Sequence, residues 1–312
     1  MTKKKKQELE KPMTPEMIQM ANAKLYDYIQ SQHFGSTIEL NEFLQKNVTG
    51  KRIDEIVPLK KGPKSNIEKS EDMMYAAYNS THVKGYKLAK EAIKLNPENV
   101  RAITYLADNE DNLEDALKLY KHAVEIGAKQ LGEIFFKENK GRFWLMHNTR
   151  PYMTAKLKYA DCLYVMDKKE ESIKEYNEIL ELNPNDNQGV RYILASVLLK
   201  CKKYNSYFAL YKKFEDEKST FWFFNYALFL FATEGATDKA NEALDNANRQ
   251  NKHVLQFMTG QKRIKIKPDG YYSPGDEKEA SYYLIDNFES WAKCIGTKAW
   301  LIDYVDNNKR CN

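Results

Sequence analysis

The most regular pattern of apolar and small residues in the chain runs from residue 155 to residue 184. Its positions recur at the spacing of two packed helices and are Ala155, Tyr159, Ala160, Leu163, Ser172, Tyr176, Ile179, Leu180 and Pro184. Ala160 and Ser172 are small where two antiparallel helices cross closely, and Tyr176 fills the space beside them. Pro184 then ends the second helix, because proline has no backbone N–H to continue it. The pattern predicts an antiparallel helix pair.

A similar pattern recurs on both sides of this pair, although less regularly. The upstream positions are Leu106, Ala107, Ala116, Tyr120 and Ala123, preceded by Ala89, Ala92, Ile93, Leu95 and Pro97. The downstream positions are Leu194, Ala195, Leu198, Tyr207, Tyr211 and Phe214, followed by Phe223, Tyr226, Ala227, Leu230, Ala240, Leu244 and Ala247. These segments resemble tetratricopeptide repeats, which are helix-turn-helix repeats of about 34 residues. The resemblance implies an all-α fold, a right-handed solenoid of about five repeats. This number is enough to bury a continuous core, because at least about three repeats are needed.

The flanks differ from the repeats in composition, and we expect them to cap the solenoid with helices. The expected divisions are a disordered basic tail over 1–12, an N-terminal helical cap and linker over 13–66, the solenoid over 67–252 and a C-terminal helical cap over 253–312. Amphipathic helices are expected over 14–32, 38–47 and 276–294, with a short last helix over 298–305. The Lys, Gly and Pro residues of 60–64 favour a linker.

The repeat pattern is interrupted between residues 127 and 148. Asn148 or Thr149 then precedes Pro151, and a polar cap with a proline in the first turn favours a helix start. We expect the interruption to hold either a long helix or a loop that folds onto one face.

The charge balance argues against a nucleic-acid surface. Lysine and arginine number 49 and aspartate and glutamate 44, which gives a net charge of +5. Five lysines and two glutamates within residues 1–12 supply +3 of this charge, so the remainder carries only +2. Basic and acidic residues mix along nearly every expected helix instead of gathering on one face. We expect the tail to be a solvated end, with a polybasic anchor or a localisation signal as the alternative.

The sequence favours a cytoplasmic protein with no membrane segment. No apolar core follows Lys3 to Lys6, as a secretory signal would require. The most apolar run, 221–232, contains Asn225 and is shorter than the roughly 20 residues of a membrane span, so it predicts a buried helix. The cysteines fit neither zinc spacing nor a disulfide framework, and we expect reduced thiols at Cys162, Cys201, Cys294 and Cys311.

Candidate catalytic chemistry is sparse. No metal-ligand spacing joins the histidines, which are His33, His82, His122, His147 and His253. No serine or cysteine lies in a recognisable nucleophile turn, and no glycine loop is suited to cradle a phosphate. We therefore expect no catalysis and no cofactor. The alternative is an enzyme whose site assembles in the groove near Arg150 and Arg191, with His147 beside Asp161 or a carboxylate of the C-terminal cap.

Three local patterns are less generic than the repeats. The first is Gly141, Phe143, Trp144, Thr149, Arg150, Pro151 and Tyr152; the second is Asn185, Asn187, Gln188, Gly189, Arg191 and Tyr192; the third is Tyr271 to Glu277 followed by Ala280, Tyr282 and Tyr283. In these residues the chain resembles, from about Glu39 onward, a bacterial group of tetratricopeptide-repeat proteins of uncharacterised function. Over 248–300 it has a weaker similarity to the C-terminal end of the eukaryotic suppressor of tumorigenicity seven proteins. Neither resemblance implies a chemical activity. Within the third pattern, we expect Asp276 to cap the N-terminus of a helix.

Candidate partner contacts follow from the repeat pattern, because the first helix of each repeat lines the concave face of such a solenoid. They are Arg150, Thr154, Asp161, Tyr164, Arg191, Tyr192, Ser196, Lys200, Phe224 and Phe231. Arg150 and Arg191 could together hold a carboxylate or phosphate. The alternative is that each arginine pairs with an acid such as Asp161 or Asp276, which would lock the fold.

The expected groove changes from polar to apolar along its length and would suit an extended peptide or a partner helix. The alternative is that the C-terminal helix folds back and covers Phe224 and Phe231 within the same chain. The sequence therefore predicts a non-catalytic scaffold or adaptor that binds a protein or peptide. A peptide-responsive regulator is the second hypothesis, although the N-terminal helices lack a clustered basic surface for DNA. The oligomeric state stays open.

Overall fold

The structure is a computed structural model that describes residues 12–51, 53–58, 62–264 and 270–310. Within these ranges the chain forms helices, turns and loops and no β-strand, which confirms the all-α fold class. None of the described helices combines the length and the apolar character that a membrane crossing requires. Residues 1–11 of the predicted basic tail, residues 60 and 61 of the predicted linker, and Cys311 lie outside the described residues.

The chain divides into two compact units, Met1–Asn185 and Asp186–Asn312. Their boundary falls inside the segment 67–252 that was predicted as one solenoid. The described helices of the first unit are α1 (Pro15–Gln30), α2 (Thr37–Asn47), α3 (Ile53–Ile56), α4 (Asn66–Tyr78), α5 (His82–Leu95), α6 (Val100–Asp108), α7 (Leu113–Leu131), α8 (Glu133–Asn139), α9 (Arg150–Val165) and α10 (Lys169–Leu182). Those of the second unit are α11 (Val190–Lys200), α12 (Tyr204–Lys213), α13 (Thr220–Glu234), α14 (Asp238–Gln250), α15 (Lys252–Met258), α16 (Glu277–Lys293) and α17 (Thr297–Arg310).

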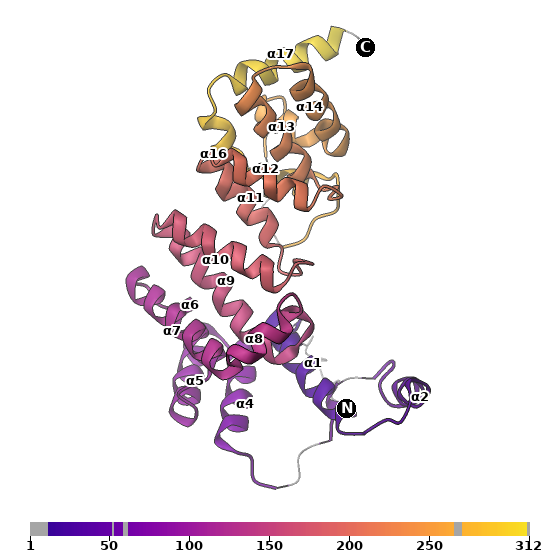
Figure 1. The fold of residues 1–312 in the computed structure, drawn as a ribbon, viewed down its shortest axis with the longest axis vertical. Helices are drawn as coiled ribbons and strands as arrows, with labels where there is room; N and C mark the ends of the chain where they lie inside the picture. The colour runs from indigo at the N-terminus through magenta and orange to yellow at the C-terminus, as the bar shows by residue number, and fades with distance from the viewer. Residues whose placement is uncertain (1–11, 52, 59–61, 265–269, 311–312) are drawn as a thin grey trace, which may run out of the picture. The chain divides into compact units, whose positions relative to one another are not determined.

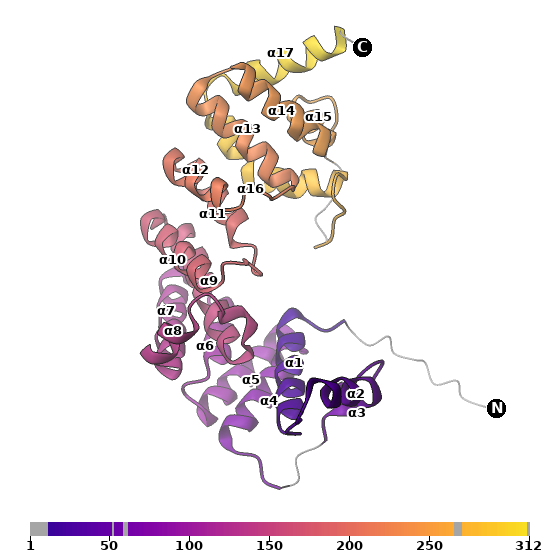
Figure 2. The same ribbon diagram turned by 45° about the vertical axis from the view of Figure 1, so that its right-hand side comes forward.

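Successive helices pack in pairs within each unit. The pairs are α4 with α5, α6 with α7 and α9 with α10 in the first unit, and α11 with α12 and α13 with α14 in the second. In Figure 1 and Figure 2 the members of each pair lie side by side. The predicted helices over 14–32 and 38–47 are present as α1 and α2, and α1 packs against α4.

The α9–α10 pair forms at the small residues that the sequence pattern identified. Ala160 and Ser172 are fully buried, and the Ser172 hydroxyl donates a hydrogen bond to the Ala160 carbonyl oxygen at 2.9 Å. The Tyr176 hydroxyl donates to the Asp161 carboxylate at 2.6 Å. Pro151 lies in the first turn of α9, where its missing N–H costs nothing. The predicted helix pair and helix start are therefore confirmed.

We expect Ala160→Trp to destabilise the first unit by about 1–3 kcal/mol, or more if the helices separate. Ala160 has no exposed surface, so an indole would force α9 and α10 apart and break the bond from Ser172. Urea denaturation followed by circular dichroism would measure the loss. The matched change Val165→Trp, at a residue 64% exposed on the same helix, should leave the free energy of unfolding nearly unchanged. Equal effects of the two changes would contradict this close packing.

The interruption after residue 127 folds as short helical pieces on the start of α9. Helix α7 continues to Leu131, and α8 and two 3₁₀ turns, Phe143–Leu145 and His147–Thr149, follow. Phe143 is fully buried among the rings of Phe135, Phe136 and Tyr152. Gly127 allows α7 to approach α9, because a Cβ atom there would lie 3.1 Å from the Tyr152 side chain. Both predicted forms are thus present in part, an extended helix and a segment folded onto one face.

The C-terminal segment of the second unit departs from the prediction in two places. Helix α15 was not predicted, and α17 extends to Arg310, beyond the expected 298–305. Helix α16 begins where expected, because the Asp276 side chain accepts a hydrogen bond from the Glu279 N–H at 2.7 Å. The apolar run 221–232 lies in α13 as the predicted buried helix, and α16 packs on α11, α13 and α15.

Candidate functional site

The aromatic face of α13 is covered by α16 and α17. Phe224 is fully buried, and its ring centroid lies 5.5 Å from that of Tyr283 and 6.5 Å from that of Trp291. The Phe231 ring stacks on Trp300 at 4.4 Å. The structure therefore corrects the prediction of Phe224 and Phe231 as partner contacts, because helices of the same chain occupy that face.

Polar groups fix α16 in this position. The Trp291 indole N–H donates to the Tyr283 hydroxyl oxygen at 2.7 Å, and that hydroxyl donates to the Asn225 side-chain oxygen at 3.1 Å. Burial raises the pKa of Tyr283 far above its usual value, so the hydroxyl stays protonated. A buried hydrogen-bond chain of this kind specifies one packing, since any other would leave its polar groups unpaired.

Helix α16 also covers one of the predicted contacts on α11, Ser196. The Ser196 hydroxyl, which is nearly fully buried, donates to the Asp286 backbone oxygen at 2.9 Å. Burial raises the pKa of the Asp286 carboxyl group, while the charge of nearby Lys200 partly opposes this shift. Ser196 is therefore a contact between helices and is not open to a partner, which corrects its predicted role.

Arg191, in the first turn of α11, forms ion pairs with two acidic residues of the same unit. Its guanidinium donates to the Asp186 carboxylate at 3.0 Å and to the Glu217 carboxylate at 2.6 Å. Burial is the largest single effect on the Glu217 pKa and raises it, but the hydrogen bonds from Arg191, Tyr192 and Ser219, together with the Arg191 charge, outweigh burial and hold the pKa below its usual value. The Asp186 carboxylate also accepts from the Val190 and Arg191 N–H groups at 2.7 and 2.8 Å. The sequence analysis considered an acid such as Asp161 or Asp276 as the partner of each arginine, and for Arg191 the structure shows Asp186 and Glu217 instead.

Tyr192 belongs to the same cluster. Its ring lies 4.4 Å from the Arg191 guanidinium carbon, and its hydroxyl oxygen accepts a hydrogen bond from Arg191 at 2.9 Å. Burial raises the pKa of Tyr192 to about 12. With two carboxylates and an aromatic face already engaged, Arg191 has little capacity left for an external anion.

Apart from Lys200 of α11, which stays a predicted contact, the remaining predicted contacts lie along α9. Thr154, Asp161 and Tyr164 are half-buried, and burial raises the pKa of the Asp161 carboxyl group. Arg150 lies eleven residues before Asp161 on the same helix, about 16 Å along the axis, so the two do not form the ion pair that was considered. In the described part of the chain, no group of three or more His, Cys, Asp or Glu residues is placed to hold a metal ion. Thr154, Asp161 and Tyr164 stay predicted partner contacts.

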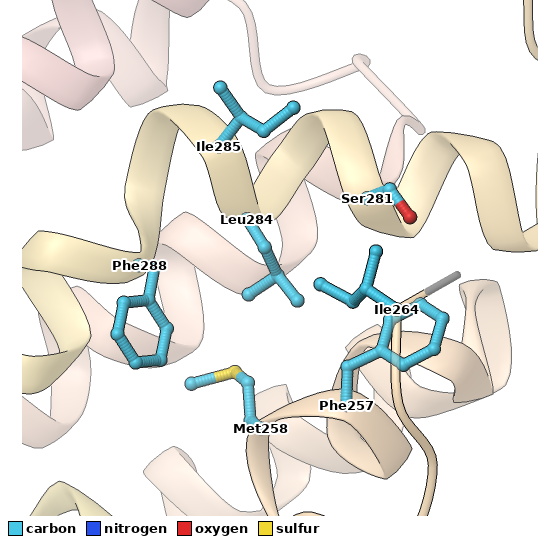
Figure 3. Close-up of a pocket in the computed structure, with 7 residues that line it drawn as sticks. All are labelled: Phe257, Met258, Ile264, Ser281, Leu284, Ile285 and Phe288. Carbon is cyan, nitrogen blue, oxygen red and sulfur yellow. The ribbon is translucent and has the colours of Figure 1, made fainter. Parts of the chain in front are cut away.

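An apolar groove between α15 and α16 was missed by the sequence analysis. It has a volume of about 320 Å³ and is lined by Phe257, Met258, Ile264, Ser281, Leu284, Ile285 and Phe288. Figure 3 shows Leu284, Met258 and Phe288 around the hollow, with Ile264 on the segment after α15. Ile264 is 49% exposed and Phe288 54% exposed, and exposed large apolar side chains gathered around one groove are typical of an interaction site. The spacing of residues 281, 284 and 288 was visible in the sequence, but the facing wall, α15, was not predicted.

No protein-family model matches this chain, and no curated protein is similar enough to count as a relative.

Proposed function

We propose that this protein is a non-catalytic scaffold of the tetratricopeptide type that binds a protein or peptide partner. The paired helices with small residues at their crossing, as at Ala160 and Ser172, support a right-handed tetratricopeptide solenoid. The single observation that carries the binding function is the open apolar groove between α15 and α16. In the second unit this groove replaces the face of α11 and α13 as the proposed binding surface.

The occupant that fits the groove best is an amphipathic helix. One wall presents Ser281, Leu284 and Phe288, which span two helical turns, about 10 Å. A partner helix with apolar residues at positions i, i+3 or i+4, and i+7 would match that wall. Phe288 is an aromatic side chain of the kind that supplies much of the affinity at interfaces.

A basic residue next to the groove in the chain favours acidic flanks on this partner helix. Arg263 directly precedes the groove-lining residue Ile264, is exposed and forms no ion pair with a residue that the structure describes. Lys262 is already paired with Glu277 of α16. An acidic residue beside the apolar positions of the partner would pair with Arg263. This pairing would raise the rate of association as well as the specificity of binding.

A display library of amphipathic helical peptides tests this function. We expect peptides with apolar residues at the matching spacing to be enriched on the intact protein. Phe288→Glu should weaken their binding roughly tenfold or more, because a charge would replace an aromatic contact. The matched control is Ile295→Glu, since Ile295 is 97% exposed and does not line the groove.

Each result of the display experiment either supports or overturns the groove as the partner site. Binding that is lost in Phe288→Glu and retained in Ile295→Glu supports the proposal. Absence of enrichment, or binding that survives Phe288→Glu, overturns the groove as a partner site. A dimer in sedimentation that Phe288→Glu dissociates would assign the groove to a second copy of the chain and also overturn it.

A further inference from the structure

Arg150 lies at the start of α9 without an acidic partner. Its Nε–H donates to the Trp144 carbonyl oxygen at 3.2 Å, and its guanidinium carbon lies 5.3 Å from the centroid of the Trp144 ring. It forms no ion pair with any residue that the structure describes. Burial lowers the pKa of Arg150, although a guanidinium stays charged at any ordinary pH. A half-buried, uncompensated cation with free N–H groups differs sharply from Arg191.

A second polar group beside Arg150 also lacks a partner. The Nδ1 atom of His147 is buried and has no hydrogen-bond partner. The His147 ring packs on Tyr26 of α1 with centroids 5.2 Å apart. Burial and then the charge of Arg150 lower the pKa of His147, while Asp27 has a smaller opposite effect. His147 is therefore neutral at pH 7, and unpaired buried groups of this kind mark a place where a ligand could complete the hydrogen bonding.

The charges of Arg150, His147 and Asp27 indicate the charge of a ligand that would bind here. One guanidinium and a neutral imidazole, with exposed Asp27 nearby, suit a single negative charge better than the double charge of a phosphate. The guanidinium edge matches a planar carboxylate through two parallel hydrogen bonds. Two exposed apolar side chains belong to this segment or touch it, since Leu145 follows Trp144 in the chain and is 67% exposed, and Tyr26 packs on His147 and is 49% exposed.

We propose that Arg150, His147 and Trp144 form a binding site for one carboxylate joined to an apolar group, as at the carboxyl terminus of a peptide that ends in a hydrophobic residue. Arg150 holds the carboxylate, His147 completes its hydrogen bonds, and Trp144 with Leu145 contacts the apolar group. The site lies within the first compact unit and is independent of the α15–α16 groove, so each proposal can fail alone.

Nuclear magnetic resonance of the histidine rings in the intact protein tests this site, with His147 assigned through His147→Gln. The probes are N-acetylphenylalanine, its uncharged amide, inorganic phosphate and an acetylated tetrapeptide of three glycines and a terminal phenylalanine. We expect the two carboxylates to shift the His147 signals and to raise the His147 pKa, because a bound anion stabilises the imidazolium. The amide should have no effect and phosphate a weaker one. Tighter binding of the tetrapeptide than of N-acetylphenylalanine would identify a peptide end as the ligand, and the reverse order a small acid.

Two variants separate the binding role of Arg150 from a structural one. Arg150→Gln should raise the His147 pKa without any ligand, because the Arg150 charge lowers it, and should weaken carboxylate binding roughly tenfold or more. Arg142→Gln, at an exposed arginine of the same segment, should change neither property. Carboxylate binding that survives Arg150→Gln, phosphate binding tighter than carboxylate binding, or no response of His147 would overturn the proposal.

Discussion

Replacing Trp291 by alanine should destabilise the second compact unit by about 3–5 kcal/mol. Trp291 is 1% exposed, packs on Phe224 and Trp300, and donates its indole N–H to the Tyr283 hydroxyl. The change removes a large buried side chain, opens a cavity and leaves a hydrogen-bond acceptor without its donor. Urea denaturation of the full chain, followed by circular dichroism, would measure the loss in free energy of unfolding.

Two controls make the Trp291 result specific. Ile295→Ala, two residues beyond α16 at a side chain 97% exposed, should change the free energy of unfolding by less than about 0.5 kcal/mol. Trp291→Phe should lower the free energy of unfolding less than Trp291→Ala, because phenylalanine keeps most of the apolar volume. It should still be destabilising, because the N–H donor is removed. A Trp291→Ala protein as stable as the wild type would mean that α16 does not cover α13.

Arg191→Ala has the second large expected effect, a loss of about 3–5 kcal/mol. Arg191 is 18% exposed, and its removal would leave the fully buried Asp186 carboxylate and the Glu217 carboxylate without their cation. Uncompensated buried charge is costly because the attraction that offset its desolvation is lost. Thermal and urea denaturation would report the change.

The matched control for Arg191 is Arg249→Ala. Arg249 is exposed, and among the described residues its side chain bonds only to the nearby Asn246 side chain, so its loss should be nearly neutral. If Arg191→Ala left stability intact and instead weakened the binding of a ligand, the structural role would be contradicted. The earlier hypothesis that Arg191 holds an anion would then regain support.

The parts of the fold that were predictable depend on residues close in sequence. The α9–α10 pair, the helix start at Pro151 and the Asp276 cap each rest on contacts within one or two helices. Local spacing specifies such contacts, because small residues must face each other where helices cross and a cap must precede its first turn.

The partners of the predicted site residues were not predictable in the same way. Glu217 lies 26 residues after Arg191, and the backbone of Asp286 lies 90 residues after Ser196. Which acid or which helix reaches a given side chain depends on the packing of whole helices, which the repeat pattern does not encode. The sequence analysis did weigh coverage of Phe224 and Phe231 by the C-terminal helix, since an apolar face exposed to water would be costly. It could not show that the same helix presents its other side, with Phe288, to a new groove.

Helix α16 closes the aromatic face of α13, and we propose that the α15–α16 groove binds the partner in its place. Hydrogen–deuterium exchange of the intact chain, alone and with a helical peptide enriched in the display experiment, tests this most directly. We expect the amides of α16 to exchange as slowly as those of α13 in the free protein, with the peptide adding protection to α15 and α16 alone. Rapid exchange of α16 in the free protein, with peptide protection on α11 and α13, would contradict the claim.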